Sequence, residues 1–448
     1  NNIIVIIIII IIINNTNLNM FSKGVLHACL YGDILSDTSF DDMTRIFEQN
    51  KSHRCIKFNH KQVDWEEHLR MCRHTNGCYC RYHMRKVSFD KLVDLLRDDI
   101  TVDEVCSRAS TQGNDLIYPE LITAAGLKFL GGEYQKSIAD FIGISIDSTR
   151  RVVHMFLDAV LICTELDLHL PKTQKELVQL ATGFDTISNT HSVFFSVIGA
   201  IDGWLRTTNK PSDVPIPGDF YSGHYKQFGS NVQAICDANL RFIYICVAGP
   251  GRTNDNRAFS RLIQSRQWLE NLSLSYCLIG DNVYTLSKKM IIPFSGSQKH
   301  DEFKRSYNFY LSQQRIRIEV AFGRLTTKWR IFRRNLDFLT AYNSKIVEAA
   351  CKLHNYVLNE DNEDFSNNTS TTNKDWGVDA LDRGPENNRG YLINRPHRGV
   401  VVDINDVASS QRESILQEIT ESDLKRPLYN MIRNDDIDYD TDYTESVE

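Results

Sequence analysis

The chain has 448 residues, of which 42% are hydrophobic, so it can build two or three domains with sizeable cores. Its eleven cysteines are scattered and several lie inside apolar runs, which excludes a disulfide framework and favours buried thiols in a reducing compartment. The net charge of −6 conceals a segment, residues 301–334, with nine Lys and Arg against three acids, so a nucleic-acid partner is not excluded.

The first nineteen residues are set apart by their composition. Residues 3–13 form a nearly pure isoleucine run flanked by asparagines, and the first methionine is Met20. The run is shorter than the roughly 20 apolar residues of a membrane span, and it lacks the basic segment of a signal peptide. We therefore interpret residues 1–19 as a translated low-complexity repeat and expect no membrane association; a membrane anchor is the alternative.

Residues 20–110 are predicted to form a helical and irregular N-terminal region. An amphipathic helix near its end has an apolar side made of Phe89, Leu92, Val93 and Leu96. Residues 72–83 also contain a dense group of zinc-type ligands, namely Cys72, His74, Cys78, Cys80 and His83. Their spacing matches no standard zinc finger, so reduced cysteines with nearby histidines are favoured over a zinc site.

Residues 111–180, which begin in a polar linker at 110–115, are predicted to form a helix-turn-helix domain. The first helix has Pro119 in its first turn, a short second helix ends at Gly143, and Ser145 caps a third helix with an apolar period of 3.6. In a helix-turn-helix the early residues of the third helix would face a major groove; they are Ser148, Thr149, Arg150 and Arg151. An ordinary helical hairpin packed on the next domain explains the pattern equally well.

Beyond Leu180 the pattern changes, and residues 190–360 are predicted to form a mixed α/β domain. Apolar runs predict strands at 194–201, 231–238, 240–247 and 274–280, with a tight hairpin at Asn239. Helices are predicted at 257–268 and 311–329. Residues 361–448 are predicted to be a polar, acidic, partly disordered tail with a helix near 409–419, and the last fourteen residues hold seven acids and no base.

Three acidic residues occupy positions that packing does not require. Asp202 and Asp281 each follow an apolar run, and the carboxyl end of an inner strand is where open α/β sheets bind ligands. Glu319 lies in a predicted helix, and Gly323, one turn later, would let that helix approach the sheet closely. Taken singly, each acid is explained as a turn residue or a solvated helix residue. As an ordered set of three, they favour a metal site.

The chemistry of phosphodiester cleavage explains such a grouping. Two Mg²⁺ ions about 3.5–4 Å apart can activate the nucleophile and stabilise the leaving oxygen. Mg²⁺ prefers oxygen ligands and keeps some of its waters, so two or three carboxylates suffice. We therefore predict that Asp202, Asp281 and Glu319 are the catalytic residues and hold Mg²⁺ or Mn²⁺, with two ions expected.

Four ordered segments resemble the catalytic blocks of the Harbinger (PIF) family of DDE transposases. The segments are 197–203, 250–259, 278–284 and 308–325, and the similarity runs in order from about Tyr82 to Leu358. The resemblance implies a ribonuclease-H-like α/β domain, a mixed sheet with flanking helices, preceded by a helical helix-turn-helix domain. It also implies that Asp202, Asp281 and Glu319 form the metal-binding triad.

The same resemblance implies partners and a cellular location. It implies action in the nucleus on terminal inverted repeats, insertion at short A/T-rich targets, and help from a Myb-like accessory protein; a homo-oligomer is also expected. Two positions depart from the family pattern. Trp204 stands where a smaller or polar residue is usual and is expected to crowd the site entrance, and Thr326-Thr327 lie where a lysine is common.

Two further groups of residues have both a functional and a structural interpretation. Asp255 either assists the metal or the substrate, or stabilises the start of a helix, where the helix dipole favours an acid. Four basic residues after Glu319 either hold the DNA backbone or form a solvated face over packed aromatic rings. They are Lys328, Arg330, Arg333 and Arg334.

The function predicted from the sequence is a Mg²⁺-dependent DNA transposase that cleaves transposon ends and joins them to target DNA. The alternative is a domesticated nuclear protein that acts as a nuclease or as a DNA-binding or partner-binding module. A third hypothesis is a structure-specific nuclease without strand transfer. The sequence has no G-x-S-x-G, P-loop or H-E-x-x-H pattern, so a serine hydrolase, an ATPase and a zincin lack support.

Overall fold

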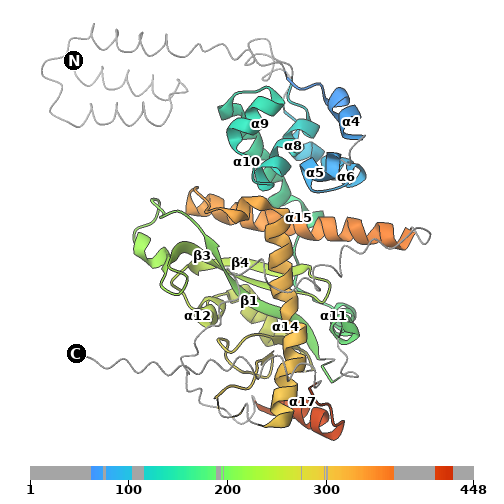
Figure 1. Ribbon diagram of the computed structural model, residues 1–448, viewed down its shortest axis with the longest axis vertical. Coiled ribbons are helices and arrows are strands. Elements are labelled where there is room, and N and C mark those ends of the chain that lie inside the picture. Colours follow the sequence, from blue (N-terminus) through green and yellow to red (C-terminus); the bar gives the residue numbers. More distant parts are fainter. Residues whose placement is uncertain are drawn as a thin grey trace, which may run out of the picture. The chain divides into compact units, whose positions relative to one another are not determined.

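The computed structural model describes residues 62–73, 77–102, 116–187, 193–194, 196–273, 275–296, 298, 301–367 and 409–426 (Figure 1). These all belong to one of the two compact units of the chain, Lys61–Glu448. The predictions for residues 1–19, for the linker at 110–115, for His74 and for the last fourteen residues lie outside this part of the chain. No described helix combines the length and the apolar character that a membrane crossing requires.

The first part of the described chain is helical. Its elements are α4 (Trp65–Arg73), α5 (Gly77–Tyr82), α6 (Lys86–Ile100), α8 (Pro119–Leu130), α9 (Gln135–Ile142), α10 (Ile146–Ile162) and η2 (Thr164–Leu166). The predicted amphipathic helix is α6, and its four apolar residues are all buried. In α10 the apolar period of 3.6 likewise buries one side of the helix against α8.

The boundaries of α8, α9 and α10 have the local causes that the sequence indicates. Pro119 occupies the first turn of α8, where a backbone N–H has no helical partner to lose. Gly143 ends α9 in the left-handed conformation, with a φ of 80°, which a glycine adopts without steric conflict. The Ser145 hydroxyl accepts a hydrogen bond from the Ser148 backbone N–H (3.1 Å) and caps α10.

The sheet that follows combines antiparallel and parallel strands. Its order is β4–β3–β1–β5–β6, with β2 paired to the start of β3. β3 is antiparallel to both β1 and β4, whereas β1, β5 and β6 run parallel. The strands are β1 (Val197–Thr207), β2 (Tyr221–Ser222), β3 (Gln227–Cys236), β4 (Phe242–Pro250), β5 (Cys277–Ile279) and β6 (Met290–Ile291), with η3 (Pro217–Phe220) before β2.

Two predicted elements differ from those observed. The helix predicted at 257–268 is interrupted at Arg261-Leu262 and forms two helices, α12 (Asp255–Ser260) and α13 (Ile263–Asn271). The predicted β3–β4 hairpin is present, but its turn is longer than one residue. In that turn, a single carboxylate oxygen of Asp237 accepts hydrogen bonds from the N–H groups of Asn239 (2.9 Å) and Arg241 (2.8 Å).

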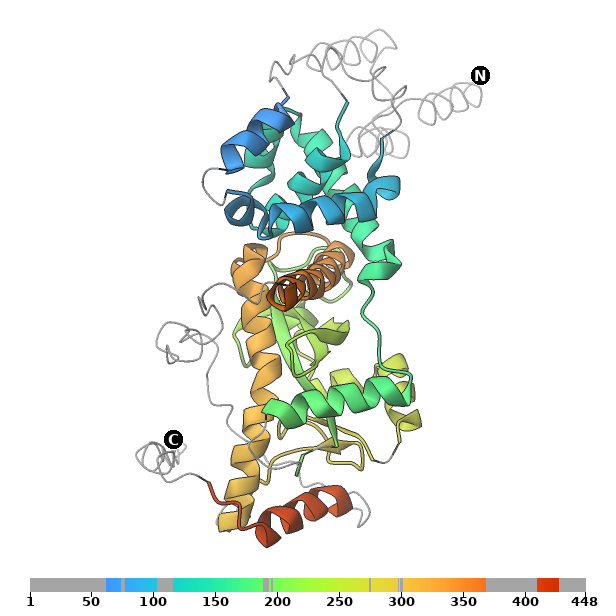
Figure 2. The same ribbon diagram turned by 90° about the vertical axis from the view of Figure 1, so that its right-hand side faces the viewer.

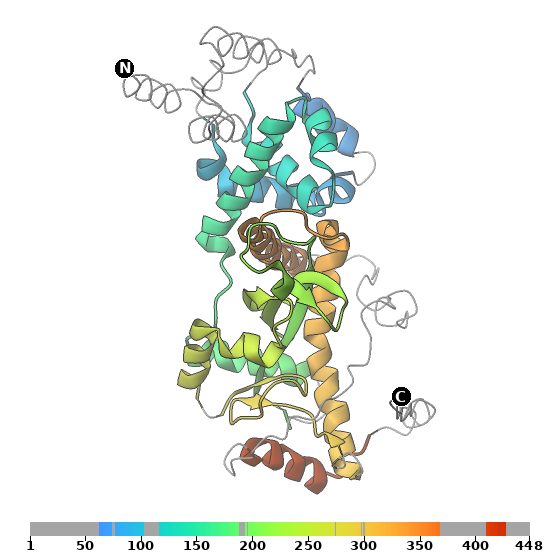
Figure 3. The same cartoon turned by 90° about the vertical axis from the view of Figure 1, so that its left-hand side faces the viewer.

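The two faces of the sheet are covered by different helices. α14 (Glu302–Lys328) packs on one face, where Ala200 and Trp204 of β1 join the same hydrophobic cluster as Phe322. α11 (Gln174–Ile187), α12 and α13 lie on the other face, where Ile201 and Ile235 join a second cluster (Figure 3). This mixed sheet with helices on both faces fits the predicted ribonuclease-H-like architecture.

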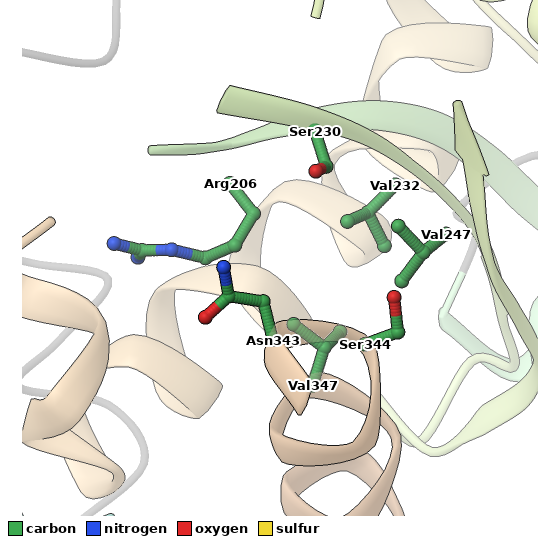
Figure 4. A pocket seen from close by; sticks show the side chains of 7 residues that line it. All are labelled: Arg206, Ser230, Val232, Val247, Asn343, Ser344 and Val347. Atoms are coloured by element: carbon green, nitrogen blue, oxygen red, sulfur yellow. The ribbon is translucent and has the colours of Figure 1, made fainter. Parts of the chain in front are cut away.

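α15 (Thr340–Asn367) packs against β4, an edge strand of the sheet, and follows η5 (Arg330–Arg333) in the chain. Figure 4 shows a small pocket between α15 and strands β1, β3 and β4, and the guanidinium of Arg206 points away from it. That guanidinium donates hydrogen bonds to the backbone oxygens of Phe332 (2.5 Å) and Arg334 (2.5 Å), and so it holds the basic turn. The pocket is lined by Arg206, Ser230, Val232, Val247, Asn343, Ser344 and Val347.

α15 also forms hydrogen bonds with the β3–β4 hairpin and with the end of the helical region. Asn355 exchanges hydrogen bonds with both backbone groups of Phe242 (2.8 and 2.7 Å). Lys352 is buried, and its ammonium donates to the backbone oxygen of Leu161 (2.6 Å) at the end of α10 and to the Asp167 carboxylate (2.6 Å). The helical region and the α/β domain therefore share one hydrophobic cluster.

The buried His354 of α15 makes stability depend on pH. Its Nε2–H donates to the backbone oxygen of Leu240 (3.0 Å), and burial lowers the pKa of its imidazole to about 4. Between pH 6.5 and 4 the unfolded chain takes up a proton that the folded protein resists. The contribution is therefore full above pH 6.5 and is lost as the pH falls toward 4, a loss on the order of 3 kcal/mol.

We expect urea denaturation to show this loss in the wild type and a flatter profile in His354→Gln. The matched control is His224→Gln, which alters an exposed histidine and should follow the wild-type profile. A His354→Gln variant with the full wild-type pH dependence would contradict the assignment.

The predicted C-terminal helix is present as α17 (Ser409–Glu421) and packs against the N-terminal part of α14 (Figure 2). Ile415 and Ile419 are buried there. Two hydrogen bonds follow the helix: the Tyr310 hydroxyl donates to the backbone oxygen of Lys425 (3.0 Å), and the backbone N–H of Arg426 donates to the Ser306 hydroxyl (3.0 Å).

Candidate active site

Asp202 lies inside β1, so the prediction that it ends a strand is wrong. The strand continues because β3 pairs with β1 as far as Thr207. On its other side β1 loses its neighbour earlier, since the last residue of β5, Ile279, is level with Ala200. Asp202 therefore stands just beyond the end of the parallel pair, and only 9% of it is exposed. One carboxylate oxygen accepts a hydrogen bond from the Gly203 N–H (2.8 Å).

Asp281 follows β5 two residues after its parallel pairing with β1 ends. Ala200 pairs with Ile279, and a Cβ at Gly280 would come within 3.3 Å of Ile201, so Asp202 and Asp281 each follow one member of this neighbouring pair. A Cβ at Gly280 would point toward Ile201 and Tyr284, which belong to the hydrophobic cluster on the face opposite α14. A turn follows at once, in which one Asp281 carboxylate oxygen accepts from the Val283 N–H (3.0 Å).

Glu319 comes from α14. Two ring contacts fix how the helix lies on the strand: Phe194 on Tyr307, with centroids 5.8 Å apart, and Trp204 on Phe322, 5.4 Å apart. Glu319 lies one turn before Phe322, and Asp202 lies two residues before Trp204. Asp202 and Glu319 therefore both lie close in sequence to the contact between Trp204 of β1 and Phe322 of α14.

Gly323 does not have the predicted role. A Cβ built there meets nothing within 4 Å, so this glycine does not bring α14 close to the sheet. The close packing of the helix comes instead from its buried residues Ile318, Ala321 and Phe322. Glu319 flanks this buried stripe and pairs with Arg315 one turn earlier, with Nη1 and Oε1 2.6 Å apart.

The donor set suits a hard divalent cation. Among the described residues, no three His, Cys, Asp or Glu side chains converge closely enough to hold a metal ion as they stand. The three acids nevertheless supply only carboxylate oxygens, the ligands that Mg²⁺ and Mn²⁺ prefer. The buried Oδ1 of Asn282, adjacent to Asp281, also has no hydrogen-bond partner in the described part of the chain. In chemistry the three residues fit such an ion, and Glu319 would have to exchange its Arg315 partner for it.

Asp255 lies on the opposite face of the sheet from Asp202. A Cβ at Gly203 would come within 1.9 Å of its Oδ1, and Gly203 points away from the face that Asp202 and Trp204 share. The same oxygen accepts hydrogen bonds from the side-chain amides of Asn231 (2.7 Å) and Gln233 (3.1 Å). Asp255 begins α12 as the structural interpretation predicts, although the helix is capped by its neighbour Asn254.

Arg317 is a partly buried cation near Asp202 that the sequence reasoning missed. Burial lowers the pKa of its guanidinium, and its buried Nε has no hydrogen-bond partner among the described residues. Burial also raises the pKa of the Cys236 thiol well above its usual range, and the charges of Asp237, Arg317 and Asp202 act on that thiol. Arg317 and Asp202 thus flank one buried cysteine.

Trp204 does not crowd a site entrance. Its ring is buried between Phe322 of α14 and Phe332 of η5, with centroids 5.4 and 5.3 Å away. The larger side chain at this position therefore fills the core between β1 and its covering helix.

The four basic residues after Glu319 surround an aromatic core. Trp329 and Phe332 are buried, whereas Arg330 and Arg333 are exposed. Lys328 donates to the backbone oxygen of His83 (3.2 Å), and Arg334 stacks on the exposed ring of Tyr134 at 4.4 Å. Packed aromatics and exposed cations thus occur together in this turn.

The four residues predicted at the start of the third helix differ in exposure. Thr149 is fully buried and its hydroxyl donates to the Ser145 backbone oxygen (3.0 Å), so the prediction that it faces DNA is wrong. Ser148 is half-buried against the cap. Arg150 and Arg151 are exposed, and Arg150 pairs with Asp147 (3.0 Å).

The described members of the Cys/His group do not converge on a metal ion. Cys72 contacts His68 (3.4 Å) and is buried, whereas Cys80 is exposed. Burial raises the pKa of the Cys78 thiol to about 11, with a further contribution from Cys72. Burial also lowers the pKa of His83 to about 4. Cys72, Cys78 and His83 thus lie in packed surroundings, and the interpretation of reduced cysteines with nearby histidines stays a prediction.

One protein-family model matches part of the chain. Residues 201–355 match the DDE superfamily endonuclease family, and this stretch contains Asp202, Asp281 and Glu319. The chain is therefore a DDE-endonuclease-related protein. Together with the curated relatives below, this match makes it a relative of the Harbinger family of DDE transposases.

The curated relatives have a low sequence identity to this chain, but their alignments with it are long. "Protein ALP1-like" of Arabidopsis thaliana is 22% identical over 300 residues, which cover 63% of this chain and 70% of the relative. "Putative nuclease HARBI1" of Bos taurus is 24% identical over 252 residues, 55% of this chain and 70% of the relative. The Xenopus laevis protein of the same name is 22% identical over 295 residues, 65% and 80%. No solved structure matches the chain.

Proposed function

We propose that the protein is a metal-dependent DNA transposase whose Asp202, Asp281 and Glu319 form the catalytic centre. One observation supports the proposal: Asp202 and Asp281 directly follow the neighbouring residues Ile201 and Gly280, and α14, which carries Glu319, packs across β1 two residues beyond Asp202. We propose Mg²⁺ or Mn²⁺ as the cofactor, with two ions, because the donors are all oxygens. The DDE family match supports a divalent ion without specifying which.

Some residues of the chain would hold the metal ions, and others would hold DNA. Asp202 and Asp281 would hold the metal from the sheet, and Glu319 would complete the set from α14 after leaving Arg315. A divalent ion at this place polarises the phosphodiester and makes a bound water more acidic. Arg317 and the released Arg315 then supply guanidinium donors suited to phosphate oxygens. Water is the nucleophile of cleavage, and the freed 3′-hydroxyl is the nucleophile of joining.

DNA contacts outside the centre are proposed for two exposed basic groups. Arg330 and Arg333 extend from the turn after α14, near the stacked pair Arg334 and Tyr134. Such cations neutralise backbone phosphates in a salt-dependent manner. The helix-turn-helix proposal rests on Arg150 and Arg151 at the start of α10, which remain available to a major groove. Terminal inverted repeats, A/T-rich targets, a Myb-like accessory protein, self-association and a nuclear location complete the proposal.

The test is a cleavage and strand-transfer assay with the full chain. The substrate is duplex DNA bearing the inverted repeats that flank its coding sequence, and the control has scrambled ends, each with Mg²⁺, Mn²⁺ or EDTA and with the neighbouring Myb-like protein. We expect cuts that need both metal and repeats, followed by joined products. Absence of cutting with every metal, together with normal DNA binding, would overturn the enzyme proposal.

The alternative is a domesticated nuclear protein that acts as a nuclease or as a DNA-binding or partner-binding module. The names of the HARBI1 relatives favour the nuclease form of it. Metal-dependent cutting without joined products would select this nuclease, and binding without cutting would select the module. A genomic copy without flanking inverted repeats would point the same way.

A further inference from the structure

A buried polar network crosses the face of the sheet opposite α14. Its centre is Gln233 of β3, which has no exposed surface. The Gln233 amide nitrogen donates to Asn231 Oδ1 (2.8 Å) and to Asp255 Oδ1 (3.1 Å), and its amide oxygen accepts from the Tyr284 hydroxyl (2.7 Å). A buried amide satisfied at both ends has a fixed orientation, because turning it over would leave donors and acceptors unpaired.

This network reaches both aspartates of the candidate site. Gln233 pairs in register with Gly203, the residue that follows Asp202 in β1. Tyr284 closes the turn that begins at Asp281, since its backbone N–H donates to the Asp281 backbone oxygen (3.2 Å). The side-chain amide of Gln233, on the sheet face opposite α14, therefore links the strand that carries Asp202 to the turn that begins at Asp281.

α12 makes a second connection to the same turn. The Asn256 amide nitrogen donates to the Thr285 hydroxyl (3.0 Å), and the Thr285 N–H donates to the Asn256 side-chain oxygen (3.2 Å). Asp255, the preceding residue, lies against Gly203 and accepts from both amides of β3. The start of α12 thus contacts β1, β3 and the Asp281 turn together.

We propose that Gln233, Tyr284 and Asp255 are positioning residues that hold the turn beginning at Asp281 beside β1, from the face of the sheet opposite α14. The inference rests on the proposed function, because it gives these residues a role in metal binding at that same site. It also assigns Asp255 a role different from that of a metal ligand: its carboxylate accepts hydrogen bonds on the face away from Glu319. β5 has only three residues, so backbone pairing alone gives the Asp281 turn little support.

The decisive variant is Tyr284→Phe, which removes one hydroxyl and leaves the buried ring in place. Its matched control is Tyr276→Phe, since Tyr276 belongs to the same hydrophobic cluster and its hydroxyl accepts from Gln174 (2.7 Å), away from both aspartates. Two quantities are measured on the full chain: Mn²⁺ affinity by calorimetry, and hydrogen exchange at the N–H groups of Val283 and Tyr284.

We expect Tyr284→Phe to weaken Mn²⁺ binding about 10-fold or more and to accelerate exchange at both amides, as for other residues that orient metal ligands. Tyr276→Phe should change neither. Unchanged exchange in Tyr284→Phe would overturn the inference. If the wild type shows no Mn²⁺ binding that depends on Asp202, the proposed metal site fails, and the exchange result still decides whether the network holds the turn.

Asp255 provides an independent test by conservative rescue. Asp255→Asn keeps an oxygen that can accept from the β3 amides, whereas Asp255→Ala removes it. We expect Mn²⁺ affinity to fall at least about 10-fold more in Asp255→Ala than in Asp255→Asn. Equal losses in the two variants would identify the charge of Asp255 as the essential feature and would overturn its assignment as a positioning residue.

Discussion

Asp202→Asn is expected to lower the rate of metal-dependent DNA cleavage roughly 10³-fold while the protein stays folded. The change removes the charge that is proposed to hold a divalent ion, and the stabilisation at stake is several kcal/mol. The fold should survive because asparagine has nearly the same shape and its side-chain oxygen can still accept from the Gly203 N–H. Single-turnover cleavage with Mn²⁺ and the thermal unfolding midpoint measure the two parts of this result.

The matched changes in the other two acids should behave alike. Asp281→Asn and Glu319→Gln are expected to cost a similar factor, since each removes one ligand from the same set. Asp94→Asn is the control, because Asp94 is an exposed acid of α6 that pairs with Arg97 (2.9 Å), and cleavage should be unchanged. Wild-type cleavage by Asp202→Asn would remove the site from consideration, whatever the other variants do.

Gly203→Ala is expected to lower the free energy of unfolding by about 3 kcal/mol, because it overpacks a closed interior. The added Cβ would lie 1.9 Å from Asp255 Oδ1 and 2.7 Å from Gln233 Nε2, in the middle of β1. Neither Asp255 nor Gln233 can move away freely, since both are held by hydrogen bonds in the network around Gln233. Urea denaturation of the purified variant measures the loss.

Gly323→Ala is the matched control for this substitution. A Cβ at Gly323 meets nothing within 4 Å, and alanine is favoured over glycine in a helix interior by about 0.5–1 kcal/mol. The two glycine-to-alanine changes should therefore shift stability in opposite directions. A Gly203→Ala protein as stable as the wild type would show that Asp255 does not lie against β1.

Elements with a strong internal pattern could be predicted from the sequence, and those defined by a partner could not. The apolar period of α10 and its cap at Ser145 are local properties, and both are observed. The end of β1 depends instead on how far β3 pairs with it, so the strand passes Asp202 without any local signal. α14 likewise begins earlier than its apolar pattern indicates, because Asp301 caps it through the Lys304 N–H (2.9 Å).

The candidate site was predictable where chemistry forces residue type and obscure where packing decides orientation. Three acids in ordered blocks carry their own signal, because few other side chains can hold a hard cation. The network around Gln233 had a weaker signal in the sequence. Asn231 and Gln233 are alternate polar residues in an apolar strand, which places two amides on one face. The burial of Thr149 had no such signal, since its hydroxyl is satisfied by a carbonyl of its own helix cap.

The docking of α17 separates two meanings of a domain boundary. Similarity to the endonuclease family ends at residue 355, yet the polypeptide returns more than fifty residues later to cover the base of the helix that carries Glu319. Arg412 lies over the Phe294 ring at 4.1 Å, and Ile415 and Ile419 seal the same surface. A fragment that ends at residue 355 would therefore expose the apolar surface of α14 that α17 covers, and it would be prone to aggregate. The part of the chain that is needed to cover α14 is longer than the stretch that matches the family.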